Sequence, residues 1–241
     1  MFRLINQVIL FWLCCCIHST HAQDNAPTLF EADYTIHAKG AKIAKMKRRF
    51  TRFDDRVYQY HSETRTAGLI SLFRKDHIIE ISKWRLEADK IVPIDYFYAH
   101  SGGKKNRTVN ISFDWKKERI TNSIDDSSWK MPTAPKVMDK LLYQLAMMYD
   151  LKSGKKPLHY MVADGGKTKN YNFEIIGEEI INTPLGKLET IKLVRLKPNS
   201  LRKSTLWCAK KLEFLPIKVE NIEKDGKITV ALINSLKGIS Y

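Results

Sequence analysis

The stretch "TVNISFDW" (residues 108–115) alternates apolar and polar side chains without a break. In an extended chain, successive side chains point to opposite faces of a sheet. One parity of this stretch carries only apolar residues, namely Val109, Ile111, Phe113 and Trp115. The pattern therefore predicts a β-strand with one buried face, and it sets the expectation for the rest of the chain.

The same two-residue period recurs on both sides of this stretch. Asp225-Gly226 predicts a tight hairpin, because a two-residue turn needs positive φ, and the segment 164–167 ("DGGK") is a second predicted turn. We expect a mainly β fold, an antiparallel meander of about ten to twelve strands curled into a barrel or half-barrel. Strands are predicted at 30–38, 42–53, 57–66, 78–87, 91–100, 108–115, 170–181, 187–196, 204–214, 216–223 and 227–236.

One segment, "APKVMDKLLYQLAMMYDLKSG" (134–154), has a different period. Pro135 suits a first helical turn and Gly154 suits a carboxyl-terminal end. The segment predicts one amphipathic helix of about four turns, packed in the concave side of the sheet. Either it is a permanent plug, or it moves as a lid and uncovers a groove for acyl chains. Its apolar residues recur at helical spacing: Val137, Met138, Leu141, Leu142, Leu145 and Met148.

The first 22 residues have the pattern of a secretory leader. Arg3 is followed by an apolar run at 8–17 and by small and polar residues up to Ala22. The run has about half the length that a membrane-spanning helix needs, so we expect a signal peptide cleaved after Ala22. A lipid-modified Cys16 is the alternative, but Cys15 directly before it is a poor match to a lipoprotein signal. Residues 23–241 are then expected to form a single β-barrel-like domain.

Removal of this leader would leave Cys208 as the one remaining cysteine. An exported chain with a single cysteine cannot form an internal disulfide, so its stability has to come from its core. Cys208 stands beside Leu206 and Trp207, and no base or helix terminus is apparent near it. We therefore expect a buried apolar side chain rather than a nucleophile.

The chain is strongly basic, with 41 Lys and Arg against 26 Asp and Glu, a net charge of +15. Loss of Arg3 with the leader would leave +14. Such a charge attracts anionic partners. An exported protein meets little nucleic acid, so the candidates are lipid headgroups, lipid A phosphates and acidic polysaccharides, with peripheral contact to a membrane surface. The simpler alternative is that these charges lie on the solvated surface of a stable basic domain and bind no specific partner.

Motifs for catalysis or metal binding are not found. The histidines outside the leader do not pair at a metal-binding spacing, and no cysteine cluster accompanies them. The adjacent Glu178 and Glu179 would point to opposite sides of their strand, which is a poor arrangement for a paired acid and base. We expect no enzyme, no bound metal and no cofactor.

Three arginines are candidates for ligand binding. If Ala44 and Met46 face inward, Arg48 and Arg52 share that face, and Arg195 has the parity of Leu193. A guanidinium inside a barrel is costly unless it is paired, so these side chains could bind an anionic headgroup. Alternatively the strand bulges, or the arginines reach a rim or an internal acid. The acyl part of such a ligand would contact Met138, Leu141, Leu142, Leu145 and Met148.

Two carboxyl-terminal stretches carry a resemblance to a known family. "TPLGKLETIKLVR" (183–195) is followed by "LWCAKKLEFLPIKVE" (206–220), with Trp-x-Ala and then Leu-Pro-hydrophobic in order. Together with "WRLEADKIVPIDYFY" (84–98), "FDWKKERI" (113–120) and "MDKLLYQLAMMYDL" (138–151), they resemble the bacterial domain-of-unknown-function family DUF3108 over about residues 28–238. The resemblance implies an exported envelope protein with a curved β-sheet, no established activity and no catalytic residue.

The family's architecture is also similar, at the level of the fold, to half-barrel carriers that shuttle lipoproteins across the periplasm. A fold does not by itself specify a function. We therefore expect a non-enzymatic periplasmic protein that binds an amphipathic anionic envelope component, a lipid or a lipid-linked glycan, in its concave face. The alternative is a structural or interaction protein that docks an envelope complex without a small ligand. The sequence does not indicate which protein such a partner would be.

Overall fold

The computed structural model describes residues 28–88, 90–196 and 201–240, and in these ranges fifteen strands form one sheet. The predicted signal peptide and the lipidation alternative at Cys16 lie outside the described residues. The strands of the amino-terminal half are β1 (Phe30–Ala38), β2 (Ala41–Asp54), β3 (Val57–Thr66), β4 (His77–Glu87), β5 (Lys90–Ser101), β6 (Arg107–Asp114), β7 (Arg119–Ile124) and β8 (Ser127–Pro132), with a 3-10 turn η1 (Leu69–Leu72) between β3 and β4.

The carboxyl-terminal half contains the single α-helix of the described residues. Its elements are β9 (Met138–Asp139), α1 (Leu142–Lys152), β10 (Leu158–Asp164), β11 (Lys167–Thr183), β12 (Gly186–Leu196), β13 (Lys203–Ala209), the 3-10 turn η2 (Lys210–Leu212), β14 (Leu215–Ile222) and β15 (Ile228–Lys237).

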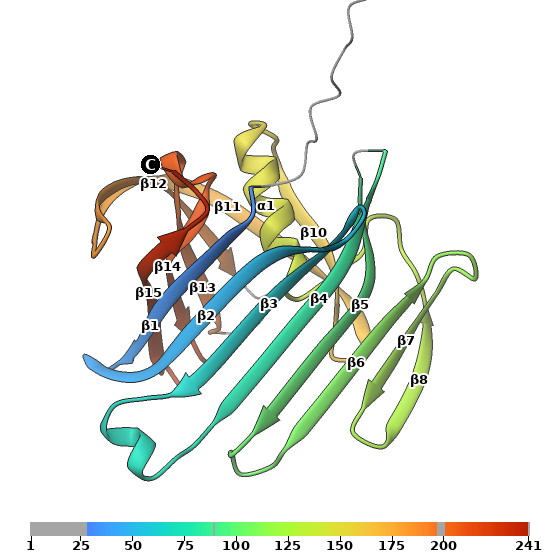
Figure 1. Ribbon diagram of the computed structural model, residues 1–241, viewed down its shortest axis with the longest axis horizontal. Coiled ribbons are helices and arrows are strands. Elements are labelled where there is room, and N and C mark those ends of the chain that lie inside the picture. Colours follow the sequence, from blue (N-terminus) through green and yellow to red (C-terminus); the bar gives the residue numbers. More distant parts are fainter. Residues whose placement is uncertain (1–27, 89, 197–200, 241) are drawn as a thin grey trace, which may run out of the picture.

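The sheet follows the chain order except at one place. Consecutive strands from β1 to β8 and from β10 to β15 pair antiparallel, β9 pairs parallel with β10, and β1 pairs antiparallel with β15. The first and last strands therefore meet in the middle of the sheet, and the free edges are β8 and β9 (Figure 1). Around Tyr34, for example, Met46 of β2 and Ile233 of β15 lie on either side.

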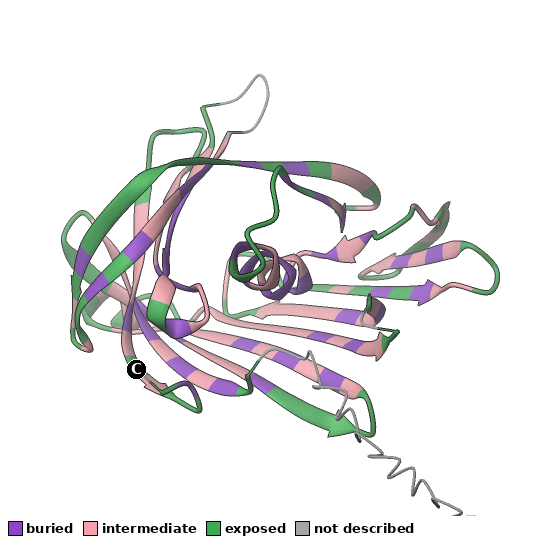
Figure 2. Cartoon of the chain, turned by 90° about the horizontal axis from the view of Figure 1, so that it is seen from above, coloured by how far each residue is buried: buried purple, intermediate pink, exposed green. Residues whose placement is uncertain are grey.

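The sheet is curled around α1 but is not closed into a barrel (Figure 2). Strands twist naturally, and bulges increase the twist and bend the strand that carries them. The register shifts in the pairs β1–β2, β2–β3, β4–β5, β11–β12, β13–β14 and β1–β15. The prediction of a curled antiparallel meander with one interior helix is confirmed, with an open sheet and fifteen strands rather than about ten to twelve.

The predicted start of the helix is wrong. Residues 134–141 are not helical, because Lys136 has a φ of 59°, and Met138 and Asp139 pair with β10 instead. Asp139 Oδ1 then accepts hydrogen bonds from the backbone N–H groups of Leu141 and Leu142, each at 2.8 Å. These bonds satisfy donors that are otherwise free at a helix start, so the helix begins after Asp139.

The hairpin predicted at Asp225-Gly226 has a longer loop than a two-residue turn. Ile222 pairs with Ile228, and Gly226 takes a φ of 77° within the loop between them. The predicted turn at 164–167 is confirmed, since Asp164 pairs with Lys167 across Gly165 and Gly166. Both glycines have positive φ, as a two-residue hairpin requires.

The core lies on both sides of α1. Leu142, Leu145 and Met148 pack in a cluster with the inner face of the amino-terminal strands, and Ala146, Met147 and Leu151 pack with β10–β13. Leu145 and Met147 lie roughly 200° apart on the helix, yet both are fully buried. The curled sheet thus covers the helix from opposite sides, and the buried surface is wider than the single stripe of an amphipathic helix.

The two edges approach each other at one end of the sheet. Trp129 of β8 donates its Nε1–H to the carbonyl oxygen of Gly166 at 3.1 Å, in the turn between β10 and β11. This contact links the amino-terminal half of the sheet to the carboxyl-terminal half beside α1. No helix in the described ranges is long and apolar enough to span a bilayer.

Candidate functional site

A pocket of about 200 Å³ lies on the concave side of the sheet, between β5–β6 and the segments that flank α1. The register places Tyr96 opposite Ile111 and Tyr98 opposite Val109, so these side chains share the inner face. The pocket is lined by Tyr96, Tyr98, Arg107, Val109, Ile111, Lys140, Asp164 and Gly165. It therefore combines an apolar and aromatic floor with charged groups on its sides.

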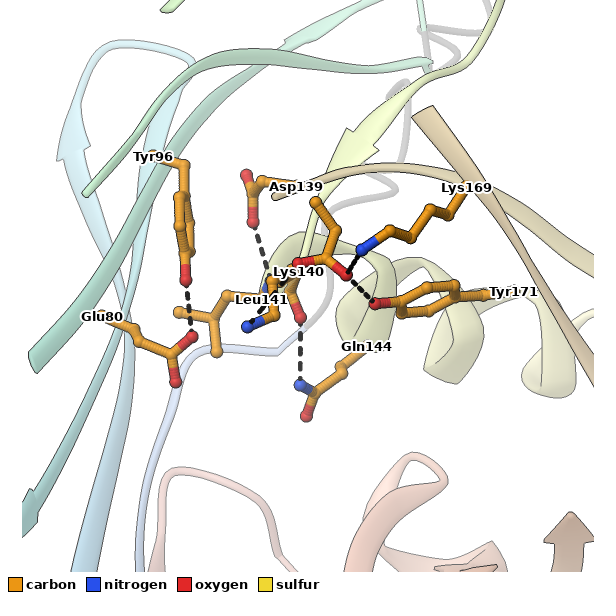
Figure 3. A network of polar contacts seen from close by, with 9 residues as sticks. Glu80, Tyr96, Asp139, Lys140, Leu141, Gln144, Lys169 and Tyr171 are labelled. Carbon is orange, nitrogen blue, oxygen red and sulfur yellow. Dashed lines mark hydrogen bonds and ion pairs between the residues drawn. The ribbon is translucent and has the colours of Figure 1, made fainter. Parts of the chain in front are cut away.

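Cations outnumber the one acid that lines this pocket. Lys140 Nζ lies 4.0 Å from Asp164 Oδ1 and 5.8 Å from the centre of the Tyr98 ring. Asp164 also accepts hydrogen bonds from Lys169 Nζ at 2.6 Å and from the Tyr171 hydroxyl at 3.1 Å (Figure 3). Although burial works to raise the pKa of Asp164, these cations hold it below its ordinary value. With Arg107 exposed at the start of β6, the pocket suits an anion.

A half-buried acid, Glu80, contacts the floor of the pocket. The Tyr96 hydroxyl donates to Glu80 Oε1 at 2.7 Å, and both side chains point into the curled sheet (Figure 3). Burial, and secondarily the negative charge of Glu80, raise the pKa of Tyr96. Tyr96 therefore stays protonated and acts as a hydrogen-bond donor rather than as a base.

Asp139 lies beside this floor and is completely buried. Besides the two backbone donors at the start of α1, its carboxylate accepts a hydrogen bond from Ser82 Oγ at 2.6 Å. Burial raises the pKa of Asp139 to about 6, against the effect of these three hydrogen bonds. The residue links β4 to the beginning of the helix, so its role in this arrangement is to position α1.

Arg48 points inward, as its parity with Met46 and Phe50 suggests. Its Nη1 donates to Gln144 Oε1 of α1 at 2.6 Å and lies 3.5 Å from the Tyr60 hydroxyl. Burial works to lower the pKa of Arg48, but the oxygens of Tyr60, Tyr34 and Glu80 outweigh it and raise the pKa. The buried guanidinium is thus held by the protein itself, mainly through the helix.

Of the other two candidate arginines, Arg52 lies apart from Arg48. Arg195 and Arg48 both act on the Tyr143 hydroxyl of α1: burial raises the pKa of this hydroxyl overall, while the two charges work to lower it. Arg52 is exposed near the end of β2, with its guanidinium 5.7 Å from the centre of the Tyr58 ring. The guanidinium of Arg195 lies over the Tyr171 ring at 3.5 Å, and Arg195 lines a separate hollow of about 150 Å³ with Ser204 and Asn221. The structure therefore does not bring the three arginines into one headgroup site.

The apolar candidates are close together. Leu141, Leu142, Leu145 and Met148 belong to one buried cluster, and Met138 is half-buried in β9 against the same cluster. They are packed against the sheet. They do not line the concave pocket, the hollow at Arg195 or a third hollow over β1–β3 and β15. An acyl chain could reach them only if α1 moved.

A wider hollow of about 700 Å³ lies over β1–β3 and β15. Most of its charged side chains are already paired within the described residues, with Lys45 as the exception. Lys47 contacts Glu31 at 3.1 Å and Asp33 at 3.6 Å, and Arg65 contacts Glu63 at 2.6 Å. We consider the smaller pocket the better candidate site because it lies on the concave side of the sheet, beside the start of α1, and has an aromatic and apolar floor.

The described residues contain no group of histidine, cysteine, aspartate and glutamate that could hold a metal ion. His77 lies 2.9 Å from Glu63, and His100 lies 2.9 Å from Asp76, as isolated pairs. Cys208 is free and fully buried, and burial raises the pKa of its thiol. The prediction that Cys208 is a buried side chain is confirmed.

Sequence reasoning missed most of the pocket. Tyr96 and Tyr98 have the same parity in a predicted strand, which is a readable signal for a shared face. Lys140 and Asp164 carry no such signal, because they come together only through the pairing of β9 with β10 and the turn that follows. Asp139 could have been recognised as a residue that begins a helix.

The fold defines a class of proteins, in which one open, curled antiparallel sheet surrounds a single helix. The chain belongs to the DUF3108 family of proteins of unknown function, which it matches over residues 33–233. A comparison with curated proteins returned no match.

The chain is similar to solved structures at low sequence identity. A β-barrel-like protein of the family DUF1849 from Brucella abortus has a TM-score of 0.56 and 6% identity, covering 88% of this chain and 98% of that one. MucB has a TM-score of 0.37 and 8% identity, covering 90% of this chain and 55% of that one. The second TM-score is too low to establish a common fold, so of these two structures the Brucella protein supports the fold.

Proposed function

We propose that this chain is an exported, non-enzymatic protein of the bacterial cell envelope that binds an anionic amphiphile, a lipid or a lipid-linked glycan. The single observation that carries the proposal is the concave pocket, where Arg107 and Lys140 stand beside Tyr98 above the apolar Val109 and Ile111. An anionic headgroup would pair with the two cations, and adjoining apolar atoms would cover the floor.

The size of the pocket limits what it can hold. Pockets for drug-sized ligands have volumes of about 300–1,000 Å³, and this one has about 200 Å³. It therefore suits a headgroup or one sugar-phosphate unit rather than a whole lipid. The remaining part of the ligand would extend out of the pocket past Arg107, which is exposed.

A binding role also fits the chemistry of the acids near the pocket. Asp164 is engaged by Lys169 and Tyr171, and Asp139 holds the start of α1. Neither carboxylate is free to act as a general base towards a ligand. The leader pattern, the basic charge and the single cysteine of the remaining chain support export.

Native mass spectrometry of the mature protein purified from the periplasm tests the proposal. We expect an additional bound mass on the wild type and at least a tenfold lower bound fraction in the double variant Arg107→Gln/Lys140→Gln. The matched control is Lys90→Gln/Lys116→Gln, two exposed lysines away from the pocket, which should keep the bound mass.

A wild-type protein with no bound mass, recovered together with other proteins, would overturn this proposal. It would favour the alternative of a protein that docks an envelope complex without a small ligand. An equal bound mass on both double variants would exclude the concave pocket as the site.

A further inference from the structure

The connection between β3 and β4 exposes three large apolar side chains at one end of the sheet. Leu69 is 83% exposed, Leu72 is 75% exposed and Phe73 is 87% exposed, all within η1 and its carboxyl-terminal neighbour. Single apolar side chains on a surface are common, but a contiguous exposed group marks an interaction site. This group, Leu69, Leu72 and Phe73, is called the apolar tip below.

The segment that carries the apolar tip is fixed by the neighbouring connections. The backbone N–H of Ala67 donates to the carbonyl oxygen of Ile43 at 2.9 Å, and Thr66 N–H donates to Asp76 O at 3.0 Å. A Cβ on Gly68 would lie 2.5 Å from Lys42 O, and one on Gly102 would lie 2.0 Å from Lys75 O. The segment is therefore held between the start of β2, next to the β1–β2 connection, and the β5–β6 connection, so the fold itself leaves the apolar tip exposed.

Cations surround the apolar tip. Asp76, the one acid of these three connections, is paired with Arg74 at 2.9 Å and lies 2.9 Å from His100. The charge of these connections is therefore strongly positive and close to the tip. The basic residues of segments 39–42, 67–76 and 102–107 are Lys39, Lys42, Arg74, Lys75, Lys104, Lys105 and Arg107.

The opposite end of the sheet lacks this combination. Phe53, in the strand end before the β2–β3 turn, is 59% exposed and stands next to Asp54 and Asp55. Lys83 Nζ lies 4.5 Å from the centre of the Phe53 ring. Asp54 and Asp55 offset the flanking Arg52 and Arg56, so this single aromatic ring lacks the strongly positive surroundings of the apolar tip. Phe53 therefore offers an internal control.

We propose that the apolar tip and the surrounding cations dock this protein on the surface of an anionic lipid bilayer. Leu69, Leu72 and Phe73 would insert into the interface between headgroups and acyl chains, and the lysines and arginines would contact the lipid phosphates. Aromatic and aliphatic side chains ringed by cations are the chemistry that a peripheral membrane site uses.

The docked orientation would bring the concave pocket to the bilayer. Arg107, which lines the pocket, directly follows the β5–β6 connection, and this connection lies against Lys75 in the segment that carries the apolar tip. In Figure 1, η1 and this connection lie at the same, lower end of the sheet, away from the upper end of α1. The inference goes beyond the ligand pocket, because docking needs no ligand and vesicle binding can be measured with the pocket residues intact.

Co-sedimentation with unilamellar vesicles tests the docking surface. We expect the mature protein to bind vesicles of phosphatidylglycerol and phosphatidylcholine at least tenfold more strongly than pure phosphatidylcholine vesicles. The variant Leu69→Ser/Leu72→Ser/Phe73→Ser should lose at least tenfold in partitioning to the anionic vesicles. Lys75→Gln/Lys104→Gln/Lys105→Gln should show a comparable loss of binding. Added salt should weaken the binding of the wild type to anionic vesicles, because it screens the same charges. Phe53→Ser should bind like the wild type.

A tryptophan at the apolar tip gives an independent measurement, because it reports contact with the bilayer directly in a protein that still binds. Phe73→Trp should show a blue-shifted emission and quenching by brominated lipids when anionic vesicles are added. Phe53→Trp should show neither change. The wild-type protein gives the background emission of the native tryptophans, against which both variants are compared.

Equal signals from the two tryptophan variants, or unchanged partitioning of the triple-serine variant, would overturn the docking proposal. Absence of wild-type binding to both vesicle types would also overturn it and leave a protein as the partner of the apolar tip. Either result leaves the mass-spectrometric test of the pocket unaffected, so the two proposals can fail separately.

Discussion

The two walls that face α1 differ in chemistry. The wall formed by β10–β13 presents an almost entirely apolar surface, with Leu158, Val162, Phe173, Leu193, Leu206 and Cys208 buried against the helix. The wall formed by β1–β7 contains an aromatic core around Tyr58 and Trp84, whose ring centroids are 4.7 Å apart. The same wall also carries polar groups on its inner face, namely Arg48, Glu80, Ser82 and Asn122.

The difference shows how the helix is held. On the apolar wall, α1 is stabilised mainly by burial, which is not directional, and by one hydrogen bond from the Tyr160 hydroxyl to Asp150 Oδ2 at 3.0 Å. On the polar wall, Gln144 and Asp139 supply partners to Arg48 and Ser82. If the helix left this site, the Arg48 guanidinium and the Ser82 hydroxyl would lose their partners, and apolar surface would be exposed to water. The comparison therefore favours a helix that stays in place, with ligands binding beside it.

The strongest way to break the arrangement is at the seam where the two walls meet. A methyl group on Gly166 would lie 2.0 Å from the Trp129 ring, at a φ of 78°. Gly166→Ala should therefore lower the free energy of unfolding by about 3 kcal/mol, from backbone strain and the displaced ring together. Urea denaturation of the purified protein measures this change.

Gly165→Ala is the matched control for that substitution. Gly165 has a φ of 62°, but the nearest atom to its new methyl group would be Lys169 Nζ at 3.5 Å, an ordinary contact. Only the backbone penalty applies, so we expect a loss of about 1 kcal/mol. Equal losses for the two alanine variants would mean that the Trp129 contact does not join the walls.

A second prediction concerns the pH dependence of the polar wall. The pKa of Asp139 is about 6 in the folded protein, and an unfolded aspartate titrates near 3.9. The folded state thus holds a proton that the unfolded state releases between these values. The contribution of Asp139 is present below about pH 4 and is lost as the pH rises to about 6, a change of about 2 kcal/mol.

Asp139→Asn removes this titration and can keep the hydrogen bonds from Leu141 and Leu142. The difference in unfolding free energy between variant and wild type should therefore change by about 2 kcal/mol between pH 4 and pH 7, in favour of the variant at pH 7. Acids with a lowered pKa, such as Glu63 and Asp76, contribute equally to both proteins and cancel. Parallel stability curves for the two proteins would show that Asp139 does not titrate in this window.

The long strands were predictable because each has a single buried face over many residues. The predicted bounds of β1 and β3 agree with the structure to the residue, at Phe30–Ala38 and Val57–Thr66. The hairpin of β7 and β8 was missed because its inner face contains Asn122, and its outer face is equally polar. A short strand with a polar residue in the core gives no clear period-two signal.

The start of the helix and the pocket could not be predicted from local sequence patterns. Val137 and Met138 fit a helical spacing as well as they fit a short strand, and only the pairing of β9 with β10 decides between them. Lys140 and Asp164 meet through that same pairing. The inward direction of Arg48 could be read from parity, but its partner Gln144 is 96 residues away. Contacts of this kind depend on the tertiary fold and leave no mark in a sequence window.

The smallest expected effect distinguishes a structural role of Arg48 from a ligand-binding role. Arg48→Met keeps the apolar stem and removes a buried guanidinium whose Nε has no hydrogen-bond partner in the described residues. Removing a buried charge offsets much of the loss of the bond to Gln144, so we expect a loss of about 1 kcal/mol. Urea denaturation of Arg48→Met, Gln144→Leu and the double variant then gives the coupling energy between the two side chains.

Adding Gln144→Leu to Arg48→Met should restore part of the stability, because the Gln144 amide is then no longer left unpaired and only the Tyr60 hydroxyl has lost its partner. Arg52→Met, in the same strand but exposed, should change the stability by less than about 0.5 kcal/mol. Strictly additive effects of Arg48→Met and Gln144→Leu would mean that the Arg48 guanidinium does not interact with Gln144 of α1. In that case the polar wall would hold an unsatisfied buried cation, and an anionic ligand at Arg48 would become the better explanation of its position.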